Sequence, residues 1–352
     1  MMRPFAPHKD RQRGAALLIV LLLVATLSFV ALSITERTTL SAMRSINDRI
    51  RAESLWVAFG AENLALAALE QAHEATDGRM SLDDPWATQP LIAPIDDGEA
   101  RLFFTDATAC FNINSLAAED GGAGLGLAVA AATPLNEFAL LVRNLGLSEF
   151  EGQALGEVIA DWTDEDANRR PQGAEDSYYS TLPSPYRTGN RKVAAVSEIR
   201  AMKDMTREIY AALKPYLCAH PDERPSVVNV NMLTERDAPL LAAIIEASEG
   251  RPTTVQRAVD IIAARPPGGY DEVSDFLQDA GLAPVSGAAA MLSGGGGPPG
   301  GTTSPRFDIT SKYVRARAEI IYDTSLFEMT AEIALDDNGR GTVLSRRFGA
   351  EE

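Results

Sequence analysis

The side chains with the clearest chemical capacity lie between Asp161 and Tyr179, in the sequence DWTDEDANRRPQGAEDSYY. Six carboxylates fall within 16 residues of this stretch: Asp161, Asp164, Glu165, Asp166, Glu175 and Asp176. Carboxylates crowded into one loop repel one another, and Ca²⁺ relieves that repulsion because it takes about six to eight oxygen ligands in flexible geometry. The spacing is not that of an EF-hand, and a solvated acidic loop neutralised by Arg169 and Arg170 is the alternative. The loop is therefore a candidate calcium site.

Catalysis finds little support in the sequence. The chain has three histidines, His8, His73 and His220, and it contains no G-x-S-x-G, H-E-x-x-H or phosphate-loop motif. Asp161 and Glu175 could form a carboxylate pair of the glycosidase type, but any acidic loop offers such a pair. We therefore expect a protein that is not an enzyme.

Near the N-terminus, residues 15–35 form an uncharged segment of 21 residues, enough for a helix of about 30 Å that crosses a bilayer. The basic leader before it, residues 1–14, should stay on the cytoplasmic side. A cleaved secretory signal is the alternative, but its apolar core is shorter, about 7–15 residues, and ends in small residues. We expect a retained single-pass anchor with the rest of the chain on the other side.

A helical stalk and an antiparallel sheet should follow the anchor. In residues 36–76, apolar side chains recur at the intervals of one helix face. Strand patterns occur in residues 77–109, which contain EARLFFTDAT, and in residues 305–352, where Asn338-Gly339 indicates a hairpin turn. Because the sheet needs an apolar partner, the stalk should pack against it. The sequence thus predicts an α+β fold, with one long helix on a small antiparallel sheet.

The two sheet segments are separated by a long insertion. Residues 110–283 are rich in helix patterns, and residues 284–304 form a flexible Gly/Pro-rich loop by composition. The insertion has a weak internal repeat, because CFNINSL at 110–116 resembles VNVNML at 228–233 and helical sequence follows each. Such helix pairs resemble SAM-like or helix-hairpin-helix modules, some of which bind DNA. The net charge of −17 and the lack of a basic cluster argue against nucleic acid as a partner.

Only two cysteines occur, Cys110 and Cys218, and both follow the anchor. Outside the cytoplasm they could form one disulfide that closes a long loop. Two buried free thiols are the alternative. The predicted topology favours the disulfide.

The leader resembles that of type IV prepilins, in which basic residues and a glycine precede an uncharged helix. In that class a prepilin peptidase cuts after the glycine, here Gly14, and the new terminal residue, Ala15, is methylated. Most members carry Glu as the fifth mature residue, but this chain has Ile19. In the class that Glu pairs with the terminal amine of the subunit above. A subunit with nothing above it needs no such Glu, so the resemblance implies a tip subunit.

Motifs further along resemble the K-type minor pseudopilins of the type II secretion system. They are DW-x-D-x-D, RP-x-GAED-x-YY, LPSPYRTGNRKVAAVSEIR, LKPYLC and the two Asn-containing repeats. The resemblance implies a pseudopilin fold with an inserted helical domain, and it implies bound calcium. The candidate ligands carried over are Asp161, Asp164, Asp166, Glu175 and Asp176.

The same resemblance implies partners and location. The partners would be the I-type and J-type minor pseudopilins, other pseudopilins, the inner-membrane assembly platform and the prepilin peptidase. The chain would sit in the bacterial inner membrane with its body in the periplasm. The alternative is a periplasmic calcium-binding module on a permanent anchor, outside any filament. Cleavage after Gly14 separates the two hypotheses, because a simple anchor keeps its leader.

Overall fold

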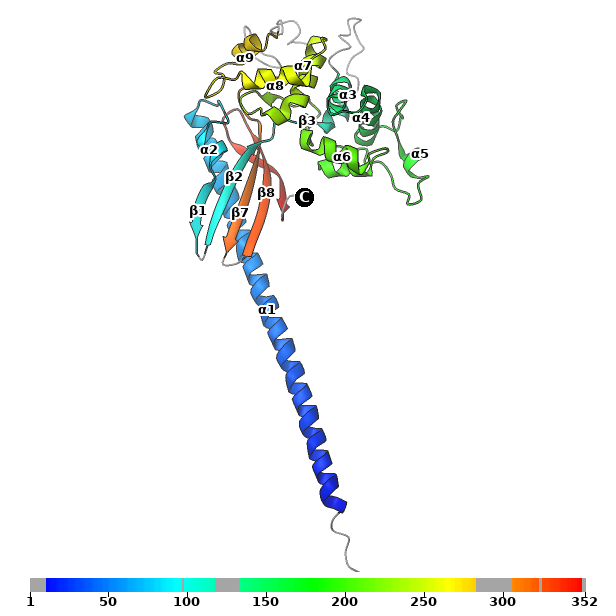
Figure 1. The fold of residues 1–352 in the computed structure, drawn as a ribbon, viewed down its shortest axis with the longest axis vertical. Coiled ribbons are helices and arrows are strands. Elements are labelled where there is room, and N and C mark those ends of the chain that lie inside the picture. The colour runs from blue at the N-terminus through cyan, green and yellow to red at the C-terminus, as the bar shows by residue number, and fades with distance from the viewer. Residues whose placement is uncertain (1–10, 97, 118–132, 283–305, 323–324, 350–352) are drawn as a thin grey trace, which may run out of the picture.

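A helix of 65 residues, α1 (Arg11–Ala75), runs from near the N-terminus into the head of the molecule (Figure 1). The computed structural model describes residues 11–96, 98–117, 133–282, 306–322 and 325–349, so most of the leader and the loop predicted at 284–304 lie outside it. Among these described residues, α1 is the one helix that is long and apolar enough to cross a membrane. Its most apolar window has a mean hydropathy of 2.9 and is not buried. A wholly exposed apolar segment of a helix fits a membrane anchor better than a core helix.

The head contains a five-stranded antiparallel sheet in the order β1-β2-β7-β8-β9. The strands are β1 (Leu91–Ile95), β2 (Gly98–Asp106), β7 (Tyr313–Tyr322), β8 (Ser325–Leu335) and β9 (Gly341–Phe348). Strand β7 shows the period of two expected from its sequence, with Val314, Ala316 and Ala318 buried between partly exposed neighbours. The predicted fold of a long helix on an antiparallel sheet is confirmed.

The C-terminal part of α1 covers the apolar face of this sheet. Its buried side chains are small at most positions, which brings the helix close to the strands: Ala58, Ala61, Ala65 and Leu69. The sheet supplies larger residues to the same core, among them Leu102, Phe104, Val314, Ile320, Met329 and Ile333. Buried residues recur every three or four positions on the helix and every second position on the strands. Each element therefore presents one apolar face, and these faces pack together into a single core layer.

Strands β8 and β9 are joined by the turn predicted at Asn338-Gly339. Gly339 has a φ of +75°, and a β-carbon there would collide with His73 near the end of α1. Asp336 Oδ1 accepts hydrogen bonds from the backbone N–H groups of Asn338 and Arg340, both at 2.9 Å. The turn therefore needs a residue without a side chain, and it seats the end of α1 against the sheet.

The insertion forms a helical domain at the end of the head farthest from the apolar N-terminal part of α1 (Figure 1). Its main helices are α3 (Pro134–Asn144), α4 (Glu149–Thr163), α6 (Arg207–Leu213), α7 (Ala238–Glu249), α8 (Val255–Ala263) and α9 (Val273–Asp279), with the short α5 (Asp176–Tyr179). A further short helix, α2 (Pro85–Thr88), lies between α1 and the sheet strands in the chain. The helical domain has its own apolar core, which is separate from that under α1.

Two short parallel strand pairs fasten this domain. β3 (Phe111–Asn112) pairs with β4 (Leu217–Cys218), and β5 (Val228–Asn229) pairs with β6 (Phe307–Asp308). Residues 307–308 differ from the expectation that all of 305–352 belongs to the main sheet. Phe307 is instead buried in the core of the helical domain, because its ring packs on Phe276 at 5.1 Å.

The weak sequence repeat has a counterpart in the hydrogen bonding. Asn114 bridges Val193, accepting from its N–H at 2.8 Å and donating to its carbonyl at 3.0 Å. Asn231 bridges Tyr270 in the same way, with distances of 2.7 and 3.0 Å. Each asparagine is fully buried and so satisfies a loop backbone that water does not reach. In each half of the insertion, the Asn-containing segment thus holds a distant loop by hydrogen bonds from one buried amide.

Candidate metal centre

The acidic loop begins where α4 ends, on the side of the head opposite β1 (Figure 1). Helix α4 starts at a capping box formed by Ser148 and Glu151, and its last turn is buried. Trp162 in that turn packs edge-on against Tyr179 of α5, with ring centroids 5.2 Å apart. Since these rings lie on either side of residues 164–175, their contact closes the loop and brings its carboxylates back toward α4.

Three carboxylates meet inside this loop. Asp164, Asp166 and Glu175 each offer one oxygen, and these oxygens all lie within 4.8 Å of one another. Within the described residues, Asp164 Oδ1 and both oxygens of Glu175 are buried and have no hydrogen-bond partner. Buried carboxylate oxygens without partners are costly. The cluster therefore has the form of a site that a cation completes.

Burial and neighbouring charges in the loop change the pKa values of its carboxylates. Burial, together with the nearby charges of Asp161 and Asp164, raises the pKa of Glu175 to about 7. Burial also raises the pKa of Asp164, against the opposing effect of its hydrogen bond from Arg170. At neutral pH the proton on Glu175 is thus readily exchanged, and a cation can take its place.

Two of the five predicted ligands lie outside this cluster, and a third, Asp164, also accepts from Arg170 through its Oδ2. Asp161 is fully buried and accepts from Arg170, at 2.9 Å from Nη1 and 3.1 Å from the backbone N–H. A side chain on Gly173 would collide with the Asp161 carboxylate, so the loop backbone lies directly on it. Asp176 accepts from the backbone N–H of Thr188 at 2.9 Å and from its hydroxyl at 2.8 Å. Both carboxylates hold the loop in shape around the other three.

The donor set suits a hard divalent cation, because carboxylate oxygens are the ligands that Ca²⁺ prefers. Sequence reasoning missed Asn190, whose Oδ1 is buried without a hydrogen-bond partner in the described structure. Its amide donates to the Asp166 carbonyl at 3.1 Å, and its φ is +42°. A Gly-Asn pair tolerates such a turn, and that is the signal that could have drawn attention to it.

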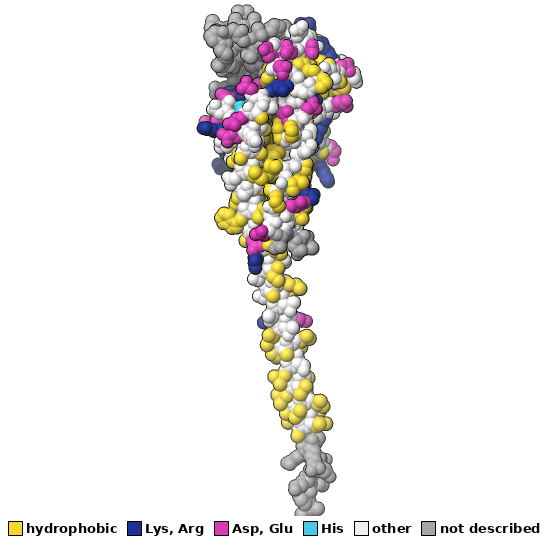
Figure 2. Space-filling model, turned by 90° about the vertical axis from the view of Figure 1, so that its left-hand side faces the viewer, with side chains coloured by type: hydrophobic (Ala, Val, Ile, Leu, Met, Phe, Trp, Pro, Cys, Tyr) yellow, Lys and Arg dark blue, Asp and Glu magenta, His cyan; other side chains and the backbone are white. Residues whose placement is uncertain are grey.

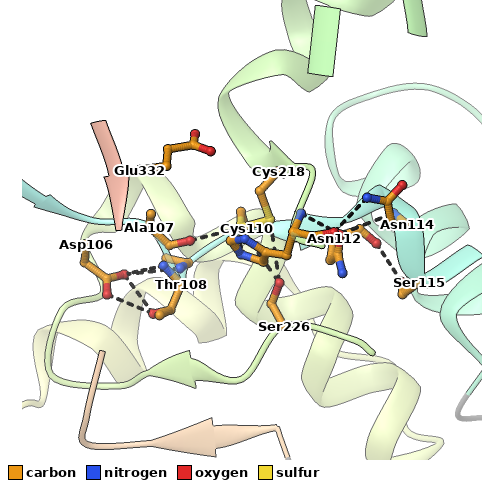
Figure 3. The surroundings of a disulfide bond; sticks show 12 residues. Asp106, Ala107, Thr108, Cys110, Asn112, Asn114, Ser115, Cys218, Ser226 and Glu332 are labelled. Atoms are coloured by element: carbon orange, nitrogen blue, oxygen red, sulfur yellow. Dashed lines mark hydrogen bonds between the residues drawn. A yellow bond between two sulfur atoms is a disulfide. The ribbon is translucent and has the colours of Figure 1, made fainter. Parts of the chain in front are cut away.

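A second group of chemically distinctive residues lies where the helical domain meets the sheet (Figure 3). A disulfide joins Cys110, next to β3, to Cys218 in β4. Ser226 Oγ lies 3.8 and 3.7 Å from the two sulfur atoms. Nearby, Asp106 at the end of β2 accepts from the N–H of Thr108 at 3.0 Å. The disulfide therefore fixes the point at which the chain leaves the sheet.

His220 packs beside this disulfide. Its Nε2 is 3.5 Å from Cys110 Sγ, and its ring stacks on Tyr313 with centroids 3.7 Å apart. Burial lowers the pKa of His220 to about 4, so the ring is neutral at physiological pH. The stacked neutral ring connects the helical domain to β7 by packing.

Comparison with known proteins gives a consistent result. Family models described as type II secretion system protein K match residues 109–222 and 228–294. Type II secretion system protein K of Pectobacterium carotovorum is 36% identical over 276 residues, covering 78% of this chain and 82% of the relative. That of Klebsiella pneumoniae is 35% identical over 280 residues, covering 80% and 83%.

A solved structure is also similar. It is the crystal structure of the GspK-GspI-GspJ complex from the enterotoxigenic Escherichia coli type 2 secretion system, and the matched chain superposes with a TM-score of 0.70 at 25% identity. The match covers 88% of this chain and all of that one. Fold, sequence motifs and relatives agree, and the chain belongs to the type II secretion system protein K family of minor pseudopilins.

Proposed function

We propose that this chain occupies the tip of the type II secretion pseudopilus, where it starts or caps the fibre during export of folded proteins. The observation that carries the proposal is the position of the helical domain. It lies at the end of the head opposite the membrane-spanning segment (Figure 1), where a further subunit would have to stack. Ile19 in place of the usual Glu supports the same position, because no terminal amine would lie above this subunit.

The partners we propose are I-type and J-type minor pseudopilins. Support comes from the similar chain, which was solved in a complex named for K, I and J components. The exposed apolar part of α1 is consistent with a single-pass anchor, so all three subunits would share one membrane. We place the body of the chain in the periplasm, where the assembly platform and other pseudopilins would meet it.

Processing of the leader tests the proposal most directly. Protein recovered from membranes that contain active prepilin peptidase should begin at Ala15, with or without one added methyl group, as measured by intact mass. A Gly14→Leu variant should keep residues 1–14, because the peptidase would no longer find its glycine. Gly60→Ala, on the same helix, is the matched control and should be processed normally. A wild-type chain that still carries Met1 would contradict the filament proposal and favour an anchored module.

We further propose that the helical domain binds calcium through Asp164, Asp166 and Glu175. The ion would supply positive charge that holds the loop together, and the residues would supply oxygen ligands. The buried, unpartnered oxygens of Asp164 and Glu175 support this. So does the arrangement of the loop: Arg170 and Thr188 engage Asp161 and Asp176, and Arg170 reaches only Oδ2 of Asp164, so that Oδ1 would be left for the ion.

Calcium should therefore raise the melting temperature of the intact chain in detergent. At a concentration about 100 times Kd, binding adds about 2.7 kcal/mol of stability, and Glu175→Gln should abolish most of it. Glu165→Gln is the matched control and should keep the calcium increment, because Glu165 is an exposed carboxylate of the same loop that lies outside the cluster. Thermal unfolding with calcium and with a chelator measures both. An undiminished increment in Glu175→Gln would remove Glu175 from the site.

The calcium response should also depend on pH in a defined direction. The folded pKa of Glu175, about 7, is raised above its ordinary value, so without metal its contribution to stability is present at low pH and lost as pH rises through 7. Calcium replaces the proton, and its stabilising increment should be larger at pH 8 than at pH 6. Equal increments at both values would show that Glu175 does not exchange a proton for the ion.

A further inference from the structure

Cys110, Cys218 and His220 bring together three atoms that can bind a metal. The two sulfur atoms and one ring nitrogen of His220 all lie within 4.8 Å of one another. Ser226 Oγ adds a fourth polar atom, 3.8 and 3.7 Å from the two sulfurs (Figure 3). All four residues are 6–9% exposed, so the group is shielded from bulk water. When the cysteines are reduced, two thiolates and an imidazole are the donors that Zn²⁺ favours.

The distances in this group suit the ligands of one tetrahedral zinc ion. With Zn–S bonds of about 2.3 Å and Zn–N bonds of about 2.0–2.1 Å, tetrahedral geometry separates sulfur from nitrogen by about 3.6 Å and two sulfurs by about 3.8 Å. His220 Nε2 already lies 3.5 Å from Cys110 Sγ. The two sulfurs have to move apart once they are thiols. A separation of 5.7 Å between the Cα atoms of Cys110 and Cys218 allows this by rotation of the side chains.

Contacts other than the disulfide hold these ligands in place. Asn112 Oδ1 accepts from the His220 backbone N–H at 3.1 Å, and the Asn114 amide donates to the His220 carbonyl at 2.7 Å. The His220 ring stacks on Tyr313 of β7, with ring centroids 3.7 Å apart. Asn112 also pairs with Cys218 between β3 and β4. Because these contacts do not involve the bond between the sulfurs, they would position the ligands in a chain whose cysteines are thiols.

We propose that the chain with reduced cysteines binds one Zn²⁺ through Cys110 Sγ, Cys218 Sγ and His220 Nε2. Ser226 Oγ stands ready for the fourth position. The cytosol keeps thiols reduced, so a newly made chain carries both cysteines in the form that binds. Each thiol releases one proton to solvent as it binds the ion, and no electron is transferred. The site is separate from the carboxylate cluster proposed for calcium, and it does not depend on the proposed position at the tip.

Zinc and the disulfide exclude each other, because both use the same two sulfur atoms. A disulfide-containing oxidant would take two electrons from the bound thiolates and two protons from solvent, and would itself become a dithiol. The bond between Cys110 and Cys218 forms in the same reaction, and Zn²⁺ leaves. In either state the two cysteines link the segment at β3 to β4. The junction between the helical domain and the sheet is therefore held before oxidation as well as after it.

The test needs a signal from sulfur, because the acidic surface of the chain attracts any divalent cation. Asp and Glu side chains are scattered over the face of the head shown in Figure 2, and the net charge is −17. Co²⁺ is a probe for zinc sites, and its bonds to thiolates give a charge-transfer absorption that carboxylates do not give. One equivalent of Co²⁺ should produce this band in the reduced full-length chain in detergent, and one equivalent of Zn²⁺ should remove it. The oxidised chain should show no band.

Variants at histidine identify the third ligand. His220→Ala should weaken Co²⁺ binding at least tenfold, since loss of even an outer-shell partner of a metal ligand costs about 10–100-fold. His220→Cys supplies another zinc ligand and should keep the band, which separates loss of the ligand from a folding defect. His73→Ala is the matched control: the change is identical, and His73, in the last turn of α1, is not among the three ligands. It should bind Co²⁺ as the wild type does.

A measurement on the wild type alone completes the test. Zn²⁺ should slow alkylation of Cys110 and Cys218 in the reduced chain, as counted by intact mass, because a bound thiolate is not free to react. A reduced chain that gives no thiolate band, or a Co²⁺ affinity that His220→Ala leaves unchanged, would overturn the proposed site. So would zinc that does not slow alkylation, or a reduced chain that is unfolded by tryptophan fluorescence and that zinc does not refold. None of these results would bear on the tip or calcium proposals.

Discussion

Removing the Cys110–Cys218 disulfide should lower the free energy of unfolding by about 4–5 kcal/mol, as expected for a closed loop of this length. The two cysteines are 108 residues apart in sequence, and the loop between them contains α3, α4, α5 and α6 together with the acidic loop. Without the bond, the unfolded chain regains the entropy that this long loop had lost. The resulting loss of stability would affect the helical domain, which carries the candidate metal centre.

The measurement is thermal unfolding of the intact chain in detergent, followed by tryptophan fluorescence. A double Cys110→Ser, Cys218→Ser variant should melt about 10 °C lower than the wild type. Each single variant should melt as low as the double one, because losing either sulfur breaks the same bond. Single variants that each lose only about half of the effect would indicate that side-chain packing, and not the covalent link, provides the stability.

The main elements of the fold could be predicted because local signals and tertiary packing agree there. The alternation of Val314, Ala316 and Ala318 specifies a half-buried strand, and Asn338-Gly339 specifies its hairpin partner. Within residues 77–109 the strand pattern is that of EARLFFTDAT, and β1 does not share it, because Pro90 and Pro94 are typical of a turn. An edge strand tolerates proline, and only the tertiary arrangement shows that β1 is an edge.

The candidate site could be predicted as a region but not as a set of ligands. Six carboxylates in 16 residues identify the loop, yet their roles depend on neighbours that sequence spacing does not reveal. Arg170, one of the two arginines that could neutralise the loop, binds Asp161 and Asp164, and its sequence position does not show which carboxylates it pairs with. Thr188, outside the acidic stretch, binds Asp176. The fold of the loop brings Asp164, Asp166 and Glu175 together, and Asp164 joins this cluster while also paired with Arg170.

The internal repeat shows where a weak sequence signal corresponds to a strong physical requirement. Asn114 and Asn231 sit at matching places in CFNINSL and VNVNML, and each is fully buried with its amide bridging a distant loop. Because a buried amide must find both donors and acceptors, such positions resist replacement more than the apolar residues around them. The acidic loop precedes the bridged Val193 but has no equally long counterpart before Tyr270.

A buried ion pair at the return from the insertion to the sheet should have the other large effect. Glu137 in the first turn of α3 is 3% exposed, and it accepts two hydrogen bonds from Arg306, one of them at 2.9 Å from Nη2. Arg306 Nε also donates to the Ser226 carbonyl at 3.1 Å. Arg306 directly precedes β6, so the pair ties the first main helix of the insertion to the segment that leads back to the sheet.

Arg306→Met should cost about 3–5 kcal/mol, because it leaves the Glu137 carboxylate buried without its counter-charge. The double variant Glu137→Leu, Arg306→Met should recover most of that loss, since apolar side chains of similar size remove the uncompensated charge. Unfolding of the wild type, both single variants and the double variant gives the coupling between the two residues. A coupling free energy below about 1 kcal/mol would mean that water solvates the two charges about as well as they stabilise each other, and that the pair does not hold the insertion in place. A strong coupling would mean that this pair holds α3 to the segment that leads back to the sheet, at a point separate from the disulfide.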